Sequence, residues 1–269
     1  MEPLQPTGPD GILNPRESHA KFRLSRYAPA EDLRPFILRY WIVEWDLRGQ
    51  PPHLQELVPQ PCVNLVFEKG DSRIYGVSTA RFSRLLADRG RVLGIKFRPG
   101  GFFPFLRTPV ATLTNRSIPA RELFGPEADA LEATILAQTD DGEMVRLAED
   151  LLRRRLPERD ENVEAVGRIV DSIAGDREIT RVGDLAKRAG LSKRTLQRLF
   201  RRYVGVSPKW VIRRYRLLEA TQRVAGVVES WPRMALDLGY FDQAHFINDF
   251  RSVVGVPPTE YARRIGPAS

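Results

Sequence analysis

Cysteine and histidine are scarce in this chain. Its 269 residues contain one cysteine, Cys62, and three histidines that stand far apart. A single cysteine excludes an internal disulfide bond, and scattered histidines offer no zinc-ligand spacing, so the sequence predicts no metal site and no cofactor. No run of about 18 apolar residues is present, which argues against a membrane span. The Pro- and Gly-rich start lacks the apolar segment of a signal peptide, and we therefore expect a cytoplasmic protein.

Positive charge is concentrated in the second part of the chain. Residues 1–160 hold 23 Lys and Arg against 22 Asp and Glu, whereas residues 161–269 hold 19 against 12. Within that part, residues 192–216 contain nine Lys or Arg residues and no acid. Such a density of positive charge fits a polyanionic partner such as nucleic acid, although a solvated basic helix face would explain the charge alone equally well.

The chain divides into regions of different secondary structure, so the expected fold class is α+β with two domains. Short β-branched and aromatic runs between Gly, Pro and Asp signals predict strands, and apolar residues at helical spacing follow them. We expect a flexible tail at 1–20, a β-rich sensor or dimerisation domain at 21–125, a helical connector and linker at 126–160, and an all-α domain at 161–269. The apolar spacing within 126–156 fits helices that relay a signal or dimerise.

A repeat with an offset of 50 residues determines the interpretation of the helical domain. Residues 200–214 and 250–264 are identical at 8 of 15 positions. Each copy has the pattern of a helix–turn–helix unit, in which a glycine ends the first helix and a Ser or Asp caps the second. We place the units at about 181–205 and 232–255.

The second helix of the first unit has an apolar face and a basic face. Its apolar residues recur at helical spacing and predict a buried stripe of Leu196, Leu199, Phe200 and Tyr203. Its opposite face carries Arg194, Gln197, Arg198 and Arg201. Arg can donate two hydrogen bonds to guanine and Gln can pair with adenine, so this face has the chemistry of base recognition in the major groove.

The corresponding helix of the second unit is much less basic. Its exposed face carries Ala244, Asn248 and Arg251, with Gln243 nearby and two aspartates beside it. We therefore expect the first unit to supply most of the affinity and base recognition.

Residues 163–265 resemble the tandem helix–turn–helix DNA-binding domain of the AraC/XylS family of bacterial transcription regulators. The resemblance rests on LAKRAGLSKRTLQRLFRRYVGVSPKWVIRRYRLLEA and on MALDLGYFDQAHFINDFRSVVGVPP. It implies sequence-specific binding to double-stranded promoter DNA, hence to the nucleoid, through recognition helices in two successive major-groove segments. Carried onto this chain, the base-contacting positions are Arg194, Gln197, Arg198, Gln243, Ala244 and Asn248. The residues toward the edges of these faces, where we expect phosphate contacts, are Lys193, Arg201, Arg202 and Arg251. Asn248 departs from the family, because many relatives have Arg there.

Residues 22–125 resemble the β-rich N-terminal domain of one branch of this family. RYW at 39–41, the LVPQPCVNLVFEKGD run, GIKFRPGG and the LTNRSIPARELFG segment carry the resemblance. It implies effector sensing or self-association, so a small-molecule effector, a second copy of the chain and RNA polymerase are open as partners. Trp41 and Trp45 would face one side of a strand and are the candidates for an effector-binding wall, although core packing explains them as well.

We interpret the chain as a regulator without enzymatic activity, and two alternatives remain open. One is a constitutive DNA-binding protein whose N-terminal domain only self-associates. The other is a DNA-modifying enzyme with Cys62 as its nucleophile, but no Pro-Cys-His-Arg run surrounds Cys62, which favours a buried thiol. His53 and Glu56 lack the second histidine of a metal pair, and no Ser/His/Asp set is visible.

Overall fold

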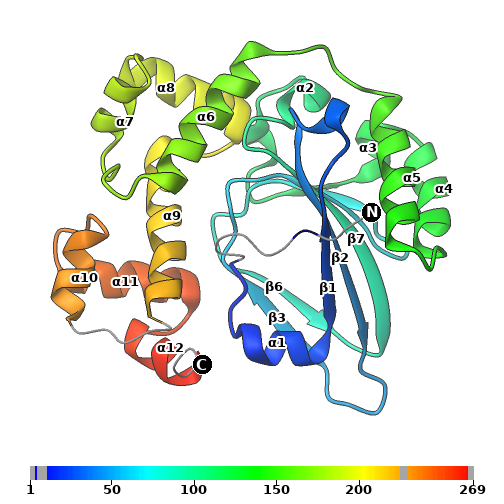
Figure 1. The fold of residues 1–269 in the computed structure, drawn as a ribbon, viewed down its shortest axis with the longest axis horizontal. Helices are drawn as coiled ribbons and strands as arrows, with labels where there is room; N and C mark the ends of the chain where they lie inside the picture. Colours follow the sequence, from blue (N-terminus) through cyan, green and yellow to red (C-terminus); the bar gives the residue numbers. More distant parts are fainter. Residues whose placement is uncertain (1–3, 5–10, 225–229, 266–269) are drawn as a thin grey trace.

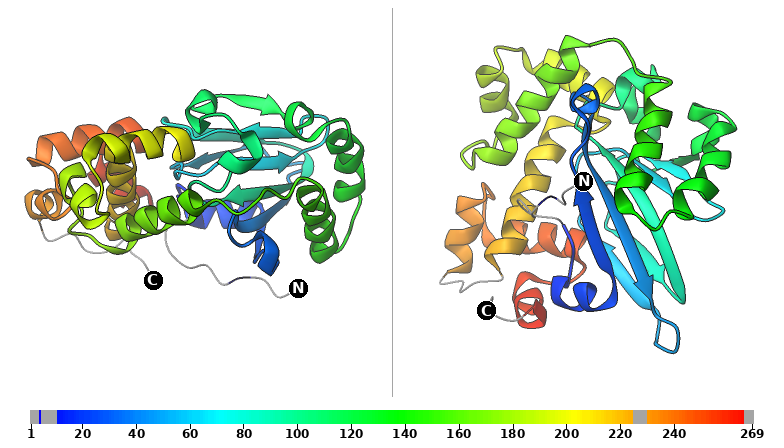
Figure 2. Two further views of the ribbon diagram at one scale, coloured as in Figure 1. Left: turned by 90° about the horizontal axis from the view of Figure 1, so that it is seen from above. Right: turned by 45° about the vertical axis from the view of Figure 1, so that its right-hand side comes forward.

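The computed structural model describes residue 4 and residues 11–224 and 230–265. A half rich in strands and a wholly helical half lie side by side (Figure 1; Figure 2). In the described part of the chain the strands fall between residues 23 and 119, and helices follow to residue 265. This order confirms the expected α+β class with an all-α C-terminal part.

A six-stranded antiparallel sheet is the framework of the first half, in the order β1-β2-β7-β4-β5-β8. The strands are β1 (Arg23–Tyr27), β2 (Ile37–Asp46), β4 (Asn64–Phe67), β5 (Arg73–Tyr75), β7 (Arg89–Phe97) and β8 (Ser117–Pro119). Side chains alternate between the two faces: Tyr40 and Ile42 are buried on one face, while Trp41 and Val43 are half-buried on the other. A separate two-stranded ribbon is formed by β3 (His53–Leu57) and β6 (Phe82–Leu86).

Helices cover the face of the sheet that carries Tyr40 and Ile42. They are α2 (Phe103–Leu106), α3 (Ala120–Phe124), α4 (Glu127–Leu136) and α5 (Asp141–Arg153), accompanied by the 3-10 segments Glu31–Leu33 and Val110–Leu113. The first residue of α5, Asp141, accepts hydrogen bonds from Arg23 at 2.9 Å and from the hydroxyl of Tyr27 at 2.8 Å, both on β1. Residues 127–153 are therefore part of the sheet domain and not a separate connector, and their apolar spacing is explained by packing within this core.

The expected tail at 1–20 is structured from residue 11 onward. Pro15–Lys21 form α1, Ile12 makes a β-bridge to Leu57, and Leu13 is buried. This order could not be predicted from the local sequence, because the contacts that hold the segment come from a distant strand, β3.

The helical half contains two helix–turn–helix units in series. The first is α7 (Val182–Arg188) and α8 (Lys193–Leu199), the latter extended by a π-helical segment, Phe200–Val204. The second is α10 (Trp231–Asp237) and α11 (Gln243–Val254). The remaining helices are α6 (Glu161–Gly175), α9 (Pro208–Arg223), which connects the units, and α12 (Pro258–Ile265). Within the described residues, no helix has the length and apolar character to cross a bilayer.

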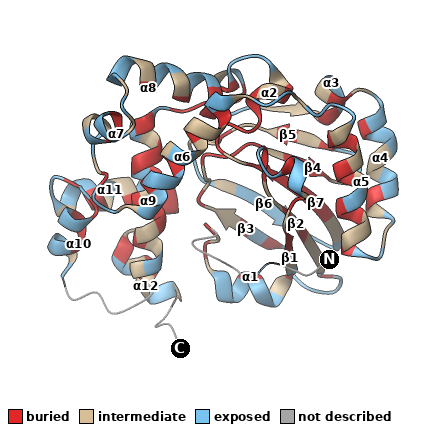
Figure 3. Ribbon diagram, turned by 45° about the horizontal axis from the view of Figure 1, so that its top comes forward, coloured by how far each residue is buried: buried red, intermediate tan, exposed pale blue. Residues whose placement is uncertain are grey.

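The two halves share a hydrophobic core. Buried residues of the sheet, of α4 to α6 and of the first unit form one continuous cluster, whereas the second unit packs in a second cluster with α9 and with Leu13 and Val58 of the sheet half. Figure 3 shows buried positions running from the sheet into the helical half. The first unit is therefore packed against the sheet domain and does not hang from a linker.

Candidate nucleic-acid interface

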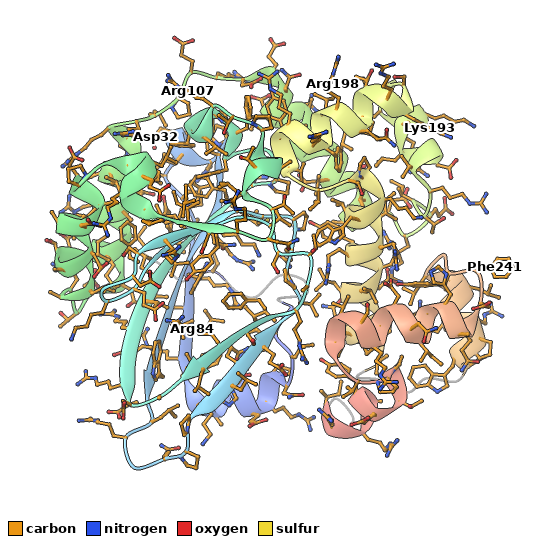
Figure 4. The ribbon with its side chains drawn as sticks, turned by 180° about the vertical axis from the view of Figure 1, so that it is seen from behind. Asp32, Arg84, Arg107, Lys193, Arg198 and Phe241 are labelled. Atoms are coloured by element: carbon orange, nitrogen blue, oxygen red, sulfur yellow. The ribbon has the colours of Figure 1, made fainter. Side chains whose placement is uncertain are left out.

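Ser192 begins the recognition helix of the first unit. Its hydroxyl accepts a hydrogen bond from the backbone N–H of Thr195 at 3.1 Å, which satisfies one of the free donors at the start of α8. Leu196 is fully buried, and the basic residues and the glutamine of α8 are exposed: Lys193, Arg194, Gln197 and Arg198. Figure 4 shows Lys193 and Arg198 at the outer surface of the molecule. The basic face predicted from the sequence is thus open to solvent.

The winding of this helix changes before it ends. The N–H of Gly205 donates to the carbonyl of Phe200 at 2.8 Å, a π-type bond that closes the segment Phe200–Val204. Gly205 has φ 96°, a left-handed conformation that favours glycine. A Cβ at this position would also lie 3.1 Å from side-chain atoms of Thr114 and Val110, so a side chain here would press on the sheet domain.

The sheet domain holds the end of this helix. Thr114 donates a hydrogen bond from Oγ1 to the carbonyl of Gly205 at 2.7 Å, and the rings of Phe103 and Tyr203 are 4.4 Å apart. The guanidinium of Arg202 lies 4.6 Å from the centre of the Phe103 ring. Arg201 and Arg202 are both exposed, but Arg202 belongs to this junction as well as to the basic surface.

Two of the nine positive charges in residues 192–216 are buried, and a third, which is exposed, is paired with an acid. Arg214 and Arg216 are 3% and 2% exposed, and Arg213 is paired with Asp249. Arg216 donates to Glu219 at 2.7 Å and to the carbonyl of Asp176 at 2.9 Å. The sequence placed all nine in one electrostatic footprint, but these three hold α9 in place, which leaves the charges of α8, of the π-helical segment and of Lys209 at the surface.

The second recognition helix begins at Asp242, whose carboxylate accepts a hydrogen bond from the N–H of His245 at 2.7 Å. Ala244, Asn248 and Arg251 are exposed on α11, and Gln243 is half-buried. Both recognition helices thus present their predicted residues, but the second presents a single arginine among them.

Asp249 does not add negative charge to the face of α11 that carries Asn248. It forms an ion pair with Arg213 of α9 and accepts a hydrogen bond from the hydroxyl of Tyr240 at 2.6 Å. Burial and the nearby carboxylate of Asp249 raise the pKa of Tyr240, so the phenol stays a donor. This network fixes the turn before α11 to α9.

Phe241 is a surface residue that the sequence analysis did not single out. It stands in the turn between α10 and α11, is 87% exposed, and projects from the edge of the second unit (Figure 4). Leu236 of α10 is 62% exposed nearby in the sequence. The position of Phe241 directly before the helix cap could have indicated its exposure, because a phenylalanine there belongs to no apolar stripe of a helix.

Comparisons with known proteins match each half separately. Residues 185–264 match a family described as a helix-turn-helix domain, and residues 25–119 match a domain of unknown function, DUF6597. The putative HTH-type transcriptional regulator YkgA of Escherichia coli is 34% identical over 83 residues, which cover 31% of this chain and 35% of YkgA. The XylDLEGF operon transcriptional activator 1 of Pseudomonas putida is 37% identical over 87 residues, 30% of this chain and 25% of that protein.

A solved transcriptional regulator with an AraC-type DNA-binding domain, from Chromobacterium violaceum, is 27% identical with a TM-score of 0.35 and covers 39% of this chain and 96% of that one. Residues 185–264 form an AraC-type DNA-binding domain. The match spans only about a third of YkgA and a quarter of the Pseudomonas activator. The resemblance read from the sequence is confirmed for this domain.

The sheet domain, which precedes the AraC-type domain, contains a cavity of about 250 Å³. Trp41 and Trp45 of β2 line it, on the face of the sheet away from α4 and α5. The indole N–H of Trp41 donates to Asn64 at 3.3 Å and that of Trp45 donates to the carbonyl of Ala87 at 2.9 Å. The structure thus brings both candidates to one wall, and their role in effector binding stays a prediction.

Each of these indoles lies over a glycine of β7. Trp41 is paired in register with Gly94 and Trp45 with Gly90. A Cβ on Gly94 would lie 1.9 Å from the Trp41 ring, and one on Gly90 would lie 2.1 Å from the Trp45 ring. The rings therefore rest directly on the backbone of β7, and the cavity lies above them.

The walls of the cavity continue into contacts with the AraC-type domain. Val58 lines the cavity and is buried in the cluster that contains Leu217 and Leu218 of α9. Gly76 and Ser78 also line it and begin the loop between β5 and β6. A change at these walls therefore acts on residues that touch the DNA-binding half.

The loop between β5 and β6 contacts the connecting helix α9 and the second unit. The carbonyl of Thr79 accepts a hydrogen bond from Arg214 of α9 at 2.8 Å. Arg81 donates to the carbonyl of Val254, the last residue of α11, at 3.1 Å and forms an ion pair with Glu56 at 3.0 Å.

The residues considered for enzyme or metal chemistry have other surroundings. Burial raises the pKa of the Cys62 thiol, which disfavours the thiolate that a nucleophile requires. His53 is buried with Nδ1 3.6 Å from Glu17, while Glu56 is paired with Arg81. The described part of the chain contains no group of three His, Cys, Asp or Glu side chains that could hold a metal ion.

Proposed function

We propose that the chain is a sequence-specific transcription regulator that reads two adjacent major-groove segments of promoter DNA. The observation that carries this proposal is the exposed basic face of α8 in an AraC-type domain with a second, less basic recognition helix, α11. In such tandem units, recognition helices enter the groove about one helical turn, roughly 34 Å, apart on one side of the DNA. Arg194 and Arg198 are the residues that we assign to base recognition.

We further propose that the sheet domain controls this activity through an effector. The residues that line its cavity are continuous with those that hold α9 and the end of α11. An occupant that shifts Val58 or Ser78 would change the contacts of Arg214 and Arg81. A ligand controls the protein only as far as it binds one arrangement of these contacts better than another.

The constitutive alternative is less favoured by the packing. Its natural dimer surface, the apolar residues of α4 and α5, is largely used within the chain: Ile135, Val145, Leu151 and Leu152 are buried in the core. Self-association would then need another surface, which sedimentation of the full chain tests directly.

The test of the proposed function starts from genomic DNA captured by the full chain. We use the full chain because the first unit shares its core with the sheet domain, so residues 161–269 alone would expose Tyr203 and its neighbours. A footprint on the captured sequence should show two protected major-groove patches about 10 base pairs apart. A single patch would show that α11 does not contact DNA. Capture of DNA without sequence preference would contradict specific recognition.

A further inference from the structure

Arg107 is an exposed arginine of the sheet domain beside the recognition helix α8. It directly follows α2, and its backbone N–H donates to the carbonyl of Phe103 at 2.8 Å. The guanidinium of Arg202 lies over the ring of this same Phe103, 4.6 Å from the ring centre. Arg107 is therefore one helical turn away from the residue that Arg202 contacts. Figure 4 shows Arg107 and Arg198 along the same upper margin of the molecule.

The backbone of Arg107 has a conformation that an arginine rarely adopts. Its φ is 59°, in the left-handed region where residues other than glycine are uncommon, and such residues often lie at functional sites. The chain after it packs on the end of the first unit, where Thr114 donates to the carbonyl of Gly205 at 2.7 Å. Contacts before and after Arg107, at Phe103 and at Thr114, thus fix this residue next to α8.

The segment that contains Arg107 has positive charge only. Residues 89–121 contain seven Lys or Arg residues and no acid. Several of the seven are paired with acids of other elements, as Arg121 is with Asp129 at 3.3 Å. Within the part of the chain that the structure describes, the side chain of Arg107 has no ion pair or hydrogen bond. Its guanidinium is therefore available to an external anion.

Arg107 continues the basic face of α8 toward the sheet domain. Arg194, Arg198 and Arg202 are exposed and follow one another at intervals of four residues, so they form a row along one side of the helix. The row begins at the positions assigned to base contact and ends over Phe103. Arg107 extends it beyond the C-terminal end of the helix, on a different domain.

One acid also belongs to this junction. The carboxylate of Asp160, the cap of α6, accepts hydrogen bonds from the hydroxyl of Tyr203 at 2.8 Å and from the N–H of Asn162 at 2.9 Å. These contacts hold the carboxylate at the start of α6. The sheet domain and the first unit share one hydrophobic core, so the position of Arg107 relative to α8 is set by packing and not by a linker.

We propose that Arg107 contacts a phosphate of the DNA backbone, so that the sheet domain forms part of the DNA-binding surface. The phosphate borders the groove segment that α8 enters, beyond the C-terminal end of this helix. The inference rests on the proposed function, because it uses the same duplex in the same position. It adds a contact from outside the AraC-type domain.

Geometry explains why the group bound is a phosphate and not a base. In a helix–turn–helix unit, residues near the N-terminal end of the recognition helix reach the base edges, and neighbouring elements meet the backbones that border the groove. Arg107 stands past the other end of α8, at this border. A guanidinium donates two parallel hydrogen bonds to a phosphate, and the contact releases about one counterion. Its contribution is therefore independent of base sequence and sensitive to salt.

The test replaces Arg107 in the full chain. Asn tolerates the left-handed conformation and glycine adopts it freely, so Arg107→Asn and Arg107→Gly should both fold, which thermal unfolding checks. Salt titrations on the selected DNA should show a slope lowered by about one unit and, at 0.15 M salt, an affinity lowered by about fivefold. Ethylation interference should lose its signal at one phosphate beyond the C-terminal end of α8. Arg107→Lys keeps the charge and should retain most of the slope.

Arg89→Asn is the matched control. Arg89 is an exposed arginine of the same acid-free segment, but it begins β7, whereas α2 follows the end of this strand. The strand spans nine residues, or roughly 30 Å, so Arg89→Asn should leave the slope and the affinity unchanged. A parental slope in Arg107→Asn or in Arg107→Gly, an unchanged ethylation pattern, or an equal loss in Arg89→Asn would each overturn the proposal.

The same measurements separate this proposal from the proposed function. A sequence-specific footprint of the parent protein, with an unchanged slope for Arg107→Asn, would support recognition by α8 and α11 and contradict the contact from the sheet domain. Binding without sequence preference, with a slope that falls in Arg107→Asn, would contradict specific recognition and support the contact.

Discussion

Arg214 of α9 donates a hydrogen bond from Nη2 to the backbone carbonyl of Thr79 at 2.8 Å, which ties the helix between the two recognition helices to the sheet domain. Arg214 is 3% exposed, and its guanidinium lies 4.6 Å from the centre of the Trp210 ring. Burial lowers its pKa to about 10, so it stays charged at neutral pH. Its Nε and Nη1 have no hydrogen-bond partner among the described residues. A buried charge held in this way stabilises one arrangement of the two halves only weakly.

The first prediction follows from this contact. Arg214→Met keeps the apolar part of the side chain and removes both the buried charge and the hydrogen bond to Thr79. Because these two effects oppose one another, the free energy of unfolding should stay within about 1 kcal/mol of the parent protein. Backbone hydrogen exchange in residues 78–81 should become faster, which mass spectrometry measures. Arg233→Met, at an exposed position of α10, is the matched control, and identical exchange in both variants would show that the contact does not restrain the loop.

The second prediction separates base recognition from phosphate contact on α8. Arg198→Ala should cost about 1–3 kcal/mol on the selected DNA and relax the preference at one base position. Arg201→Ala should weaken binding to all sequences alike and lower the salt slope by about one unit. Salt titrations on selected and scrambled DNA measure both, with Arg146→Ala on α5 as the control. Equal losses on both DNAs for Arg198→Ala would restrict this arginine to phosphate contact.

The third prediction concerns the weaker second unit. Asn248 is exposed on α11 but uncharged and short, so Asn248→Ala should reduce affinity less than Arg198→Ala does. Asn248→Arg should raise affinity, because it adds a cation to a face where Asp249 is already neutralised by Arg213. Electrophoretic mobility shifts on the selected DNA measure the change. Lower affinity for Asn248→Arg would place this face away from the DNA.

The fourth prediction concerns acid stability. Burial tends to raise the pKa of Asp141, but hydrogen bonds from Arg23 and Tyr27 and the charge of Arg23 lower it by more, so that it lies at about 2. The pKa in the folded protein is therefore below the unfolded value of about 3.9. The resulting stability is fully present above the unfolded pKa and is lost as the pH falls toward 2.

Asp141→Asn should thus lower the free energy of unfolding by about 2 kcal/mol at pH 7, and the difference should shrink steadily below pH 4. Urea denaturation at several pH values measures this, with the exposed Glu122→Gln as the control. A difference that does not depend on pH would mean that the aspartate acts by shape alone and not by charge.

The helical half was largely predictable because its signals are local. The repeat, the caps at Ser192 and Asp242, and the left-handed glycines Gly205 and Gly255 each depend on neighbours in the sequence. The burial of Arg214 and Arg216 was not predictable, since their partners lie in segments far along the chain.

The cavity could not be predicted for a related reason. That Trp41 and Trp45 share a side follows from strand periodicity, but the position of their rings over Gly94 and Gly90 depends on which strands pair and in which register. No local pattern encodes that pairing. The packing of α4 and α5 onto the sheet, where a free connector was expected, likewise depends on contacts between distant segments and could not be predicted.

The glycines beneath the two indoles determine how a substitution could alter the cavity. A methyl group at Gly90 or Gly94 would collide with the indole above it. The free space above β7 therefore depends on the absence of a Cβ at both positions. A single alanine at position 94 would push the indole of Trp41 upward into the space that a ligand would occupy. The cavity would then be filled by the protein's own tryptophan, so a single base change in the gene could close the cavity without altering any residue of the DNA-binding half.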